Sequence, residues 1–244
     1  MKRFLLIILL SLMITGCEDK KEDENSEIVV EKPTEVTLWG VVYSVIDTDV
    51  LDLSLLELTG PIPPEIGYLT NLTSLTLFYN QLTGEIPPEI GNLTKLTTLS
   101  LSSNQLLGSI PPEIGNLTNL TNLQLNNNQL TGIIPAEIGN LTNLINLNIS
   151  NNVLSGSIPS EIGNLTNLTI LNIGNNILSG TIPPEIGNLT CETLLYKNQL
   201  SGIVPGEICN QVNNLPWLSE NQLCPPYPSC VEDIIGEQNT SGCD

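Results

Sequence analysis

Acidic side chains recur along the sequence at a nearly constant interval. Seven glutamates follow one another in steps of 24 residues, with a last step of 22, at Glu65, Glu89, Glu113, Glu137, Glu161, Glu185 and Glu207. If successive repeats stack like neighbouring strands, these carboxylates lie about 5 Å apart, where like charges repel. Such a row could bind Ca²⁺ or Mg²⁺. We favour the simpler interpretation, a solvated face on convex turns, and predict no metal site.

Catalytic chemistry has little support in the sequence. Histidine is absent, which excludes His-dependent nucleophilic triads and the commonest zinc-ligand sets. The acidic pairs lie on predicted turns, with no partner base and no pocket that would raise a pKa. We therefore predict that the protein is not an enzyme and uses no cofactor.

The net charge limits the possible partners. The chain has 26 acidic and seven basic residues, and its formal net charge is −19. Nucleic acids and anionic membrane surfaces are bound through Lys and Arg, which displace counterions. The charge therefore argues against a nucleic-acid partner.

A period of 24 residues organises most of the chain. The pair Ile-Pro recurs at Ile62, Ile86, Ile110, Ile134, Ile158 and Ile182. Residues 93–116 contain the pattern L-x-x-L-x-L-x-x-N-x-L, in which Leu99 and Leu101 point to one side of a short strand. Gly108 permits the turn after the strand, and Pro111-Pro112 begin a short helical turn on the opposite side.

This pattern predicts an α/β solenoid, a leucine-rich-repeat right-handed superhelix of about eight coils. A parallel β-sheet forms the concave side, and short helical or 3-10 turns form the convex side. The strands are expected near residues 51, 75, 99, 123, 147, 171, 194 and 216. One coil cannot bury its own Leu/Ile face, so the coils are stabilised by stacking. An asparagine after each strand but the first is expected to satisfy backbone groups of adjacent coils, at Asn80, Asn104, Asn128, Asn152, Asn176, Asn198 and Asn221.

The repeat Leu-Thr-Gly-x-Ile-Pro-x-x-Ile-Gly resembles the plant-type leucine-rich repeat of receptor-kinase ectodomains and polygalacturonase-inhibiting proteins. The resemblance covers residues 36–230, with Trp39-Gly40-Val41 similar to the family's N-terminal cap and residues 221–230 similar to its C-terminal cap. The family's N-terminal cap cysteines are missing, and Tyr43 lies near one of their positions. The resemblance implies binding of a protein, peptide or glycan on the concave sheet, although a fold alone does not fix a function.

The first residues have the features of an export signal. Lys2 and Arg3 precede a short apolar stretch over residues 4–13, too short to span a bilayer comfortably. Residues 14–17, Ile-Thr-Gly-Cys, resemble a bacterial lipobox, which implies cleavage before Cys17 and a lipid on that cysteine. An ordinary signal peptide is the alternative. We predict an exported protein, lipid-anchored to the bacterial cell envelope and facing outward.

The chain divides into five segments by composition. Residues 1–16 are the predicted signal peptide, and residues 17–34 are the lipidated Cys17 and an acidic tether that is too polar to order itself. An N-terminal cap is expected over 35–50, and the leucine-rich repeats over 51–208. A degenerate last coil and a cysteine-containing cap are expected over 209–244.

Five cysteines follow Cys17, all in the last quarter of the chain. Disulfides suit an exported protein, and a solenoid needs a closed end. We expect two disulfides within the set Cys209, Cys224, Cys230 and Cys243, with Cys191 left over. Four cysteines allow three pairings, among which the sequence does not choose. A metal site is the alternative, although the spacings are irregular.

The predicted function is a binding or adhesion module for a protein, peptide or glycan on the concave face. Candidate ligand-binding residues are Asp52, Leu55, Thr76, Phe78, Tyr79, Gln124, Asn126 and Asn148. Ser100, Ser102, Ser103 and Ser150 are also expected to face outward, which makes most of the sheet a neutral amide and hydroxyl surface. Phe78 and Tyr79 stand out because exposed aromatics contribute strongly to interfaces. Alternatively, these two side chains pack under the cap around Trp39.

A structural role is the competing hypothesis. The protein would then be an envelope spacer, or an ice-binding surface that uses regular Thr/Asn columns. The outward column of the sheet reads Asn/Ser rather than uniform Thr, which argues against ice binding.

Overall fold

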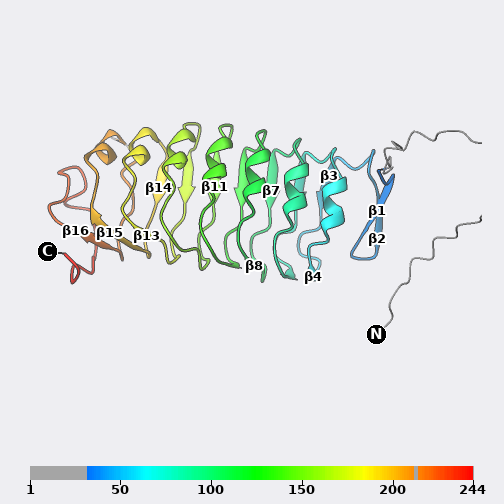
Figure 1. The fold of residues 1–244 in the computed structure, drawn as a ribbon, viewed down its shortest axis with the longest axis horizontal. Coiled ribbons are helices and arrows are strands. Elements are labelled where there is room, and N and C mark those ends of the chain that lie inside the picture. Colours follow the sequence, from blue (N-terminus) through cyan, green and yellow to red (C-terminus); the bar gives the residue numbers. More distant parts are fainter. Residues whose placement is uncertain (1–31, 212–213, 244) are drawn as a thin grey trace, which may run out of the picture. The chain divides into compact units, whose positions relative to one another are not determined.

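The computed structural model (Figure 1) describes residues 32–211 and 214–243, and from Pro33 onward the chain forms one compact unit. The predicted signal peptide, Cys17 and the tether as far as residue 31 lie outside the described residues. Among the described residues, no helix is long and apolar enough to cross a membrane.

The folded unit begins with a β-hairpin. β1 (Glu35–Leu38) pairs antiparallel with β2 (Val41–Ser44). The turn residues Trp39 and Gly40 both have positive φ, 45° and 84°, the combination that two-residue hairpins require. Val36 and Leu38 are buried against the first coil, so the hairpin covers the apolar end of the solenoid.

A seven-stranded parallel sheet follows, with the strands in chain order. We number the coils by these strands, so that coil 1 contains β3 and coil 7 contains β14. The strands are β3 (Val50–Asp52), β5 (Ser74–Thr76), β7 (Thr98–Ser100), β9 (Asn122–Gln124), β11 (Asn146–Asn148), β12 (Ile170–Asn172) and β14 (Glu192–Leu194). These positions confirm the predicted strands. The eighth, in coil 8, is reduced to a single bridge between Leu194 and Trp217.

Short 3-10 turns line the opposite side of the coils, as predicted, and Figure 1 shows them stacked in a row. Each has a proline in extended conformation before its first residue, and each carries a glutamate of the periodic series in its first turn. They are η1 (Pro64–Tyr68), η2 (Pro88–Asn92), η3 (Pro112–Asn116), η4 (Ala136–Asn140), η5 (Ser160–Asn164), η6 (Pro184–Asn188) and η7 (Gly206–Asn210).

The glycine within these turns is required by close stacking. A Cβ placed on Gly115 would lie 2.6 Å from the backbone oxygen of Glu137 in the next coil. Real Cβ atoms do not approach backbone so closely, so any side chain at this position would separate the two turns. The Ile-Gly pair of the repeat is therefore a packing requirement of the convex side.

A second set of strands, which the sequence analysis did not predict, lies between the concave sheet and the 3-10 turns in chain order. It consists of three short parallel sheets rather than one. The strands are β4 (Thr59–Pro61) with β6 (Gln81–Thr83), β8 (Leu107–Gly108) with β10 (Gln129–Leu130), and β13 (Ser179–Gly180) with β15 (Gln199–Ile203) and β16 (Gln222–Cys224). Gly108 has a φ of 76°, as its predicted role in the turn requires.

The core is a continuous stack of Leu and Ile side chains, including fully buried Leu99 and Leu101. The asparagine column holds the coils together, as predicted. Asn128 accepts a hydrogen bond from the Leu106 backbone N–H at 3.0 Å, and it donates to the carbonyl oxygens of Leu101 and Leu125 at 3.0 and 3.1 Å. One amide thus satisfies backbone groups on two coils.

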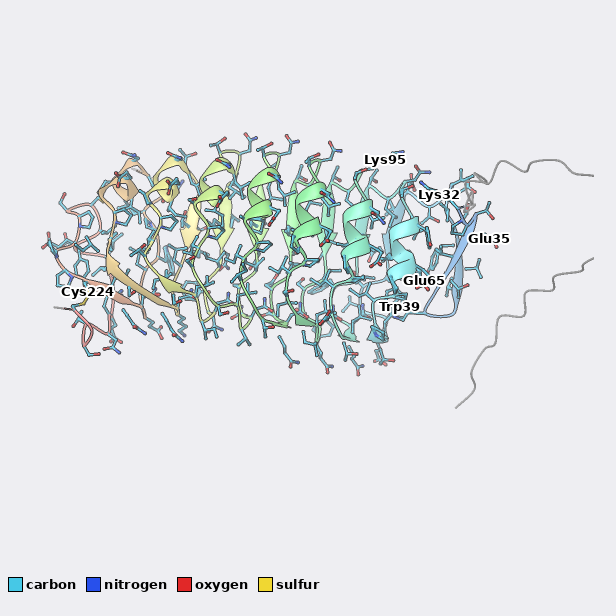
Figure 2. The ribbon with its side chains drawn as sticks, in the orientation of Figure 1. Lys32, Glu35, Trp39, Glu65, Lys95 and Cys224 are labelled. Atoms are coloured by element: carbon cyan, nitrogen blue, oxygen red, sulfur yellow. A yellow bond between two sulfur atoms is a disulfide. The ribbon has the colours of Figure 1, made fainter. Side chains whose placement is uncertain are left out.

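The C-terminal end departs from the repeat and contains two disulfides, Cys209–Cys230 and Cys224–Cys243. They join the four cysteines that the sequence analysis put forward. Cys191 is free and buried, and burial raises the pKa of its thiol. Thr193, fully buried, occupies the position of a core leucine beside it. Figure 2 shows Trp39 near the cap end and Cys224 near the other end of the unit.

Candidate ligand-binding face

The concave sheet presents its side chains in columns, because parallel strands pair in register. Thr76, Ser100 and Gln124 form part of one column, and Asn148 continues it on the next strand. Asp52 begins the same column on β3. Three further columns run parallel to it, one before it and two after it in each coil.

Several side chains of these columns are held by the residues that follow them. The Ser54 backbone N–H donates to Oδ1 of Asp52 at 3.0 Å, and this hydrogen bond is the main cause that lowers the pKa of the carboxyl group. In the same way, Oδ1 of Asn148 accepts from the N–H and the hydroxyl of Ser150, at 3.2 and 2.8 Å. Asp52 is therefore a fixed negative charge at neutral pH.

The expectation that every serine of the sheet faces solvent was wrong. Ser100, Ser102 and Ser150 are only 5%, 2% and 2% exposed. Ser100 and Ser102 lie 3.3 Å apart, oxygen to oxygen, and the Ser150 hydroxyl donates to Oδ1 of Asn148, so these short side chains bond within their own coils. The accessible polar groups in the middle of the face are therefore mostly amides, including Gln124, Asn126 and Asn148, which are partly exposed.

One column has a left-handed backbone in every coil. Its φ values lie between 53° and 62° at Leu55, Tyr79, Ser103, Asn127, Asn151, Asn175, Lys197 and Glu220. Asparagine adopts this conformation readily, whereas a bulky residue costs roughly 1–2 kcal/mol there. The central coils use asparagine. Both ends of the column, in contrast, carry residues that are strained at this position, a pattern typical of functional sites.

The N-terminal aromatic patch consists of Leu55, Phe78 and Tyr79. The rings of Phe78 and Tyr79 contact each other, with centroids 5.7 Å apart and an interplanar angle of 49°. Phe78 is 39% exposed, Tyr79 62% and Leu55 63%. Leu55 and Tyr79 line one surface hollow together with Glu57. These residues do not pack under the cap, since Trp39 packs against the core while the patch faces solvent.

A C-terminal aromatic patch, which the sequence analysis missed, consists of Tyr196 and Trp217. Trp217 is 61% exposed and continues the Asp52 column, through its bridge to Leu194. The Tyr196 ring lies across Gly174, where an added Cβ would be 2.8 Å from the ring. The irregular steps of 22 and 23 residues hide this register in the sequence. Counting forward from Leu194 by one shortened repeat would have found Trp217.

An ion pair lies beside this patch. Nζ of Lys197 is 3.6 Å from a carboxylate oxygen of Glu220, and both side chains are about half exposed. An exposed pair of this kind contributes about 0–1 kcal/mol. Lys197 and Glu220 are therefore available to a ligand.

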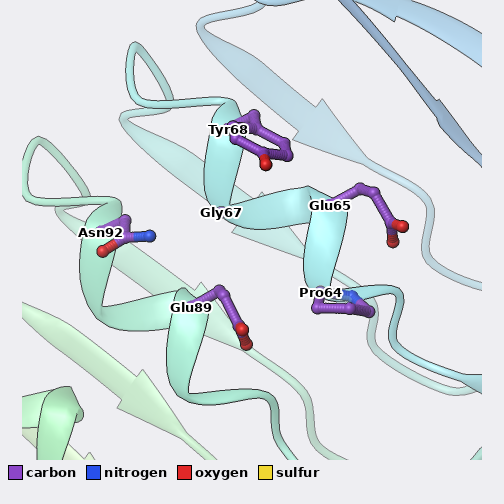
Figure 3. Close-up of a pocket in the computed structure, with 6 residues that line it drawn as sticks. All are labelled: Pro64, Glu65, Gly67, Tyr68, Glu89 and Asn92. Atoms are coloured by element: carbon purple, nitrogen blue, oxygen red, sulfur yellow. The ribbon is translucent and has the colours of Figure 1, made fainter. Parts of the chain in front are cut away.

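The convex side has a shallow hollow between the first two 3-10 turns. Figure 3 shows Glu65 and Glu89 at equivalent positions on η1 and η2, with Tyr68 and Asn92 nearby. Within the described residues, no group of three or more acidic or cysteine side chains is arranged to hold a metal ion. We see no reason to place a ligand here.

A uniform threonine column runs along the loop between the 3-10 turns and the concave strands. The column has six members, and all of them are exposed: Thr70, Thr94, Thr118, Thr142, Thr166 and Thr190. Asparagines of the following coil fix the backbone beneath it, as when Nδ2 of Asn119 donates to the Thr94 carbonyl at 2.8 Å. This column is the regular Thr array that the concave sheet does not provide.

These features define a solenoid protein whose concave face is open and carries exposed aromatic residues at both ends. A sequence model described as "Leucine-rich repeat region" matches residues 50–154, and one described as "Leucine Rich Repeat" matches residues 167–189. Together they account for more than half of the chain, which belongs to the leucine-rich-repeat family. No curated protein matches the sequence.

Solved structures of plant proteins share this fold. The chain is 45% identical to the plant peptide hormone receptor RGFR1, solved in complex with RGF2, with a TM-score of 0.69, covering 72% of this chain and 28% of that one. It is 40% identical to the ectodomain of GASSHO1/SCHENGEN3 from Arabidopsis thaliana, solved in complex with CASPARIAN STRIP INTEGRITY FACTOR 2, with a TM-score of 0.69, covering 73% and 22%. The chain thus spans about a quarter of the length of these receptors.

A third similar structure belongs to a protein with a different function. A plant ice-binding protein is 28% identical, with a TM-score of 0.51, and the match covers 74% of each chain. Its extent is therefore closer to that of this chain than the extent of the receptors is.

Proposed function

We propose that this chain is a ligand-binding leucine-rich-repeat module whose concave face takes an extended peptide. The observation that carries the proposal is the exposure of Phe78 and Tyr79 on that face, with Tyr79 held in a left-handed backbone. Exposed aromatic side chains make large contributions to interfaces, and strain retained at an exposed position favours a functional role.

The remaining geometry supports an extended ligand. The amides of Gln124, Asn126 and Asn148 offer donors and acceptors between the two aromatic patches, where a peptide backbone needs hydrogen-bond partners. Asp52 and Thr76 extend these contacts toward the N-terminal patch. Similarity to two receptors solved with their ligands supports the same class of ligand. A folded protein or a glycan, whose hydroxyl groups also suit amides, is the alternative ligand.

The test is selection of binders from a library of random linear peptides displayed on phage, with the purified full chain as bait. We expect enriched peptides whose affinity falls at least tenfold when Phe78 and Tyr79 are both replaced by serine. The matched control is Tyr68→Ser, which removes an exposed ring from the convex side. Unchanged affinity in the double variant, or a clear fall in its melting temperature, would contradict a binding role for the patch.

We also propose that the protein is exported and carries a lipid on Cys17, facing outward from the cell envelope. The lipobox-like residues 14–17 support this proposal, and two or more acyl chains give stable anchoring where one is marginal. Detergent phase partitioning of the wild-type and Cys17→Ser chains tests it. We expect only the wild type to enter the detergent phase, and entry of both would reject the anchor.

The second candidate function is ice binding through the threonine column. It is favoured by the six exposed threonines, whose spacing equals that of the stacked coils, about 4.8 Å, and by the similarity to a plant ice-binding protein. Thermal hysteresis of the purified chain distinguishes it from peptide binding. If this function is correct, replacing Thr118 and Thr142 by lysine abolishes the hysteresis, while the Phe78/Tyr79 double variant retains it. A wild-type chain without hysteresis rejects ice binding.

A further inference from the structure

The charges of the concave face are confined to its two ends. The side chains of β7, β9, β11 and β12 are all uncharged. Asp52 and Glu57 lie at the N-terminal end, and Glu192 and Glu220 lie at the C-terminal end. Carboxylates and exposed aromatic rings therefore occur in the same two places, with a neutral amide surface between them.

At the N-terminal end, ring and carboxylate share one site. Glu57 and Tyr79 line the same hollow, and the ring of the preceding residue, Phe78, contacts the ring of Tyr79. A Lys or Arg side chain is attracted both by the face of an aromatic ring and by a carboxylate. The hollow therefore fits a single cationic side chain, with Leu55 in contact with its aliphatic part.

The C-terminal end also has exposed rings and carboxylates, but here Trp217 and Glu220 line two separate hollows of the same coil. Trp217 and Tyr196 provide the rings, and Glu192 and Glu220 provide the carboxylates. Lys197 opposes a cationic ligand, but its 3.6 Å pair with Glu220 is half exposed and weak. A guanidinium group from a ligand could take its place on Glu220, because it binds a carboxylate through two hydrogen bonds, while the neighbouring part of the ligand contacts Trp217.

The separation of the two sites sets the length of the ligand. Phe78 lies in coil 2 and Trp217 in coil 8, and six steps of about 4.8 Å give roughly 29 Å. An extended peptide advances about 3.3 Å per residue. Two side chains about eight or nine residues apart would therefore reach both sites at once.

We infer that the preferred ligand is an extended peptide with a basic residue toward each end, about eight positions apart, and an uncharged middle. The inference rests on the proposed function and adds the charge and the spacing of the ligand. The net charge of −19 strengthens the selection, because it attracts cationic ligands over several ångströms and repels acidic ones.

The test uses synthetic peptides with blocked ends and fluorescent labels. Two arginines are separated by three, seven or eleven Gly/Ser/Asn residues, and matched peptides carry one arginine, two glutamates or no charge. Binding to the full chain is measured by fluorescence anisotropy at two salt concentrations. We expect the seven-residue spacing to bind at least tenfold more tightly than the single-arginine peptide, since the second contact becomes intramolecular, and we expect the affinity to fall with salt.

Variants at the two ends of the concave face test which residues bind each arginine of the peptide. Tyr79→Ser and Trp217→Ser should each reduce the affinity of the seven-residue-spaced peptide to that of the single-arginine peptide. Lys197→Gln should increase it several-fold, because it frees Glu220. Tyr68→Ser is the control that should change nothing, and melting temperatures check that each variant is folded.

The outcomes separate this inference from the proposed function. Equal binding of the uncharged or the two-glutamate peptide, or an affinity independent of spacing, would overturn the inference while leaving peptide binding intact. If neither these probes nor any library peptide binds, the proposed function itself fails. Weaker binding by Lys197→Gln would also overturn the inference, because it would place an acidic ligand group at that end.

Discussion

The central coils and the C-terminal coils solve the same packing problem with different residues. Residues 93–188 repeat every 24 positions, and each coil there has a core of Leu and Ile and a partly or fully buried asparagine. After Leu189 the step shortens, Cys191 and Thr193 enter the core, and two disulfides appear. A central coil has a similar neighbour on both sides, whereas the last coils must also form an end.

This difference also applies to function. The central coils present uncharged amides on the concave face and mostly asparagine at the left-handed positions, which tolerates this conformation better than other residues with a side chain. Aromatic rings, charges and strained backbone are found toward the ends. The departures from the repeat therefore indicate the candidate site, and the regular coils hold its two parts at a fixed distance.

The largest expected effect is a loss of stability in the C-terminal coils, but not in the central coils, when the disulfides are reduced. Losing a native disulfide typically costs about 2–5 kcal/mol, and both disulfides in the described part of the chain lie beyond Ser201. A reducing agent should therefore loosen the last coils first. Hydrogen exchange should show faster amide exchange in coils beyond Ser201 while amides near Leu99 stay protected. Uniform loosening along the chain would mean that the cysteines do not stabilise a local cap.

The next effect tests the central coils. Asn128→Ala removes one accepted and at least two donated hydrogen bonds and leaves the Leu106 N–H without its partner. An unsatisfied buried backbone group costs about 1–3 kcal/mol, so we expect a loss of that size in chemical denaturation. Gln129→Ala, at the adjacent exposed position, is the control and should change stability by less than about 0.5 kcal/mol. A loss as small as that of the control would refute the structural role of the asparagine column.

Sequence reasoning succeeded where one residue type recurs at one interval. The strands, the convex turns and the role of Asn128 follow from the 24-residue period, because stacking coils make each column experience one environment. The reasoning failed where the environment depends on neighbouring side chains. The burial of Ser100 and Ser102 depends on how their hydroxyl groups pack, 3.3 Å apart, and the position of Trp217 depends on two shortened repeats.

The second set of strands was missed for a related reason. Those strands are two to five residues long and pair in groups of two or three, and each contains a glycine or lies opposite one, a residue that is depleted in strands. The N-terminal patch was predicted because Phe78 and Tyr79 are aromatic residues in a chain that has few. Its strain was not predicted, since the left-handed conformation is visible only in the backbone.

The smallest expected effect is a change in folding stability at the left-handed positions. It should be a gain at the N-terminal end and a loss in the central coils, so it tests the comparison of the two regions directly. Leu55 and Asn127 occupy equivalent left-handed positions, with φ values of 62° and 56°. Leu55→Asn should stabilise the fold by about 1 kcal/mol, because asparagine tolerates this conformation and leucine does not. Asn127→Leu should destabilise it by a similar amount. Denaturant midpoints at constant m-value measure both changes.

The same pair of variants distinguishes strain retained for binding from strain without a role. If Leu55 contacts the ligand, Leu55→Asn weakens binding of the library-selected peptides while it stabilises the fold, a trade-off typical of functional sites. Ser103→Asn, one coil beyond the patch, provides the control, because it should relieve strain without affecting affinity. Should Leu55→Asn gain stability and keep full affinity, the departure from asparagine at this end would have no function, and the N-terminal patch would be reduced to its two aromatic rings.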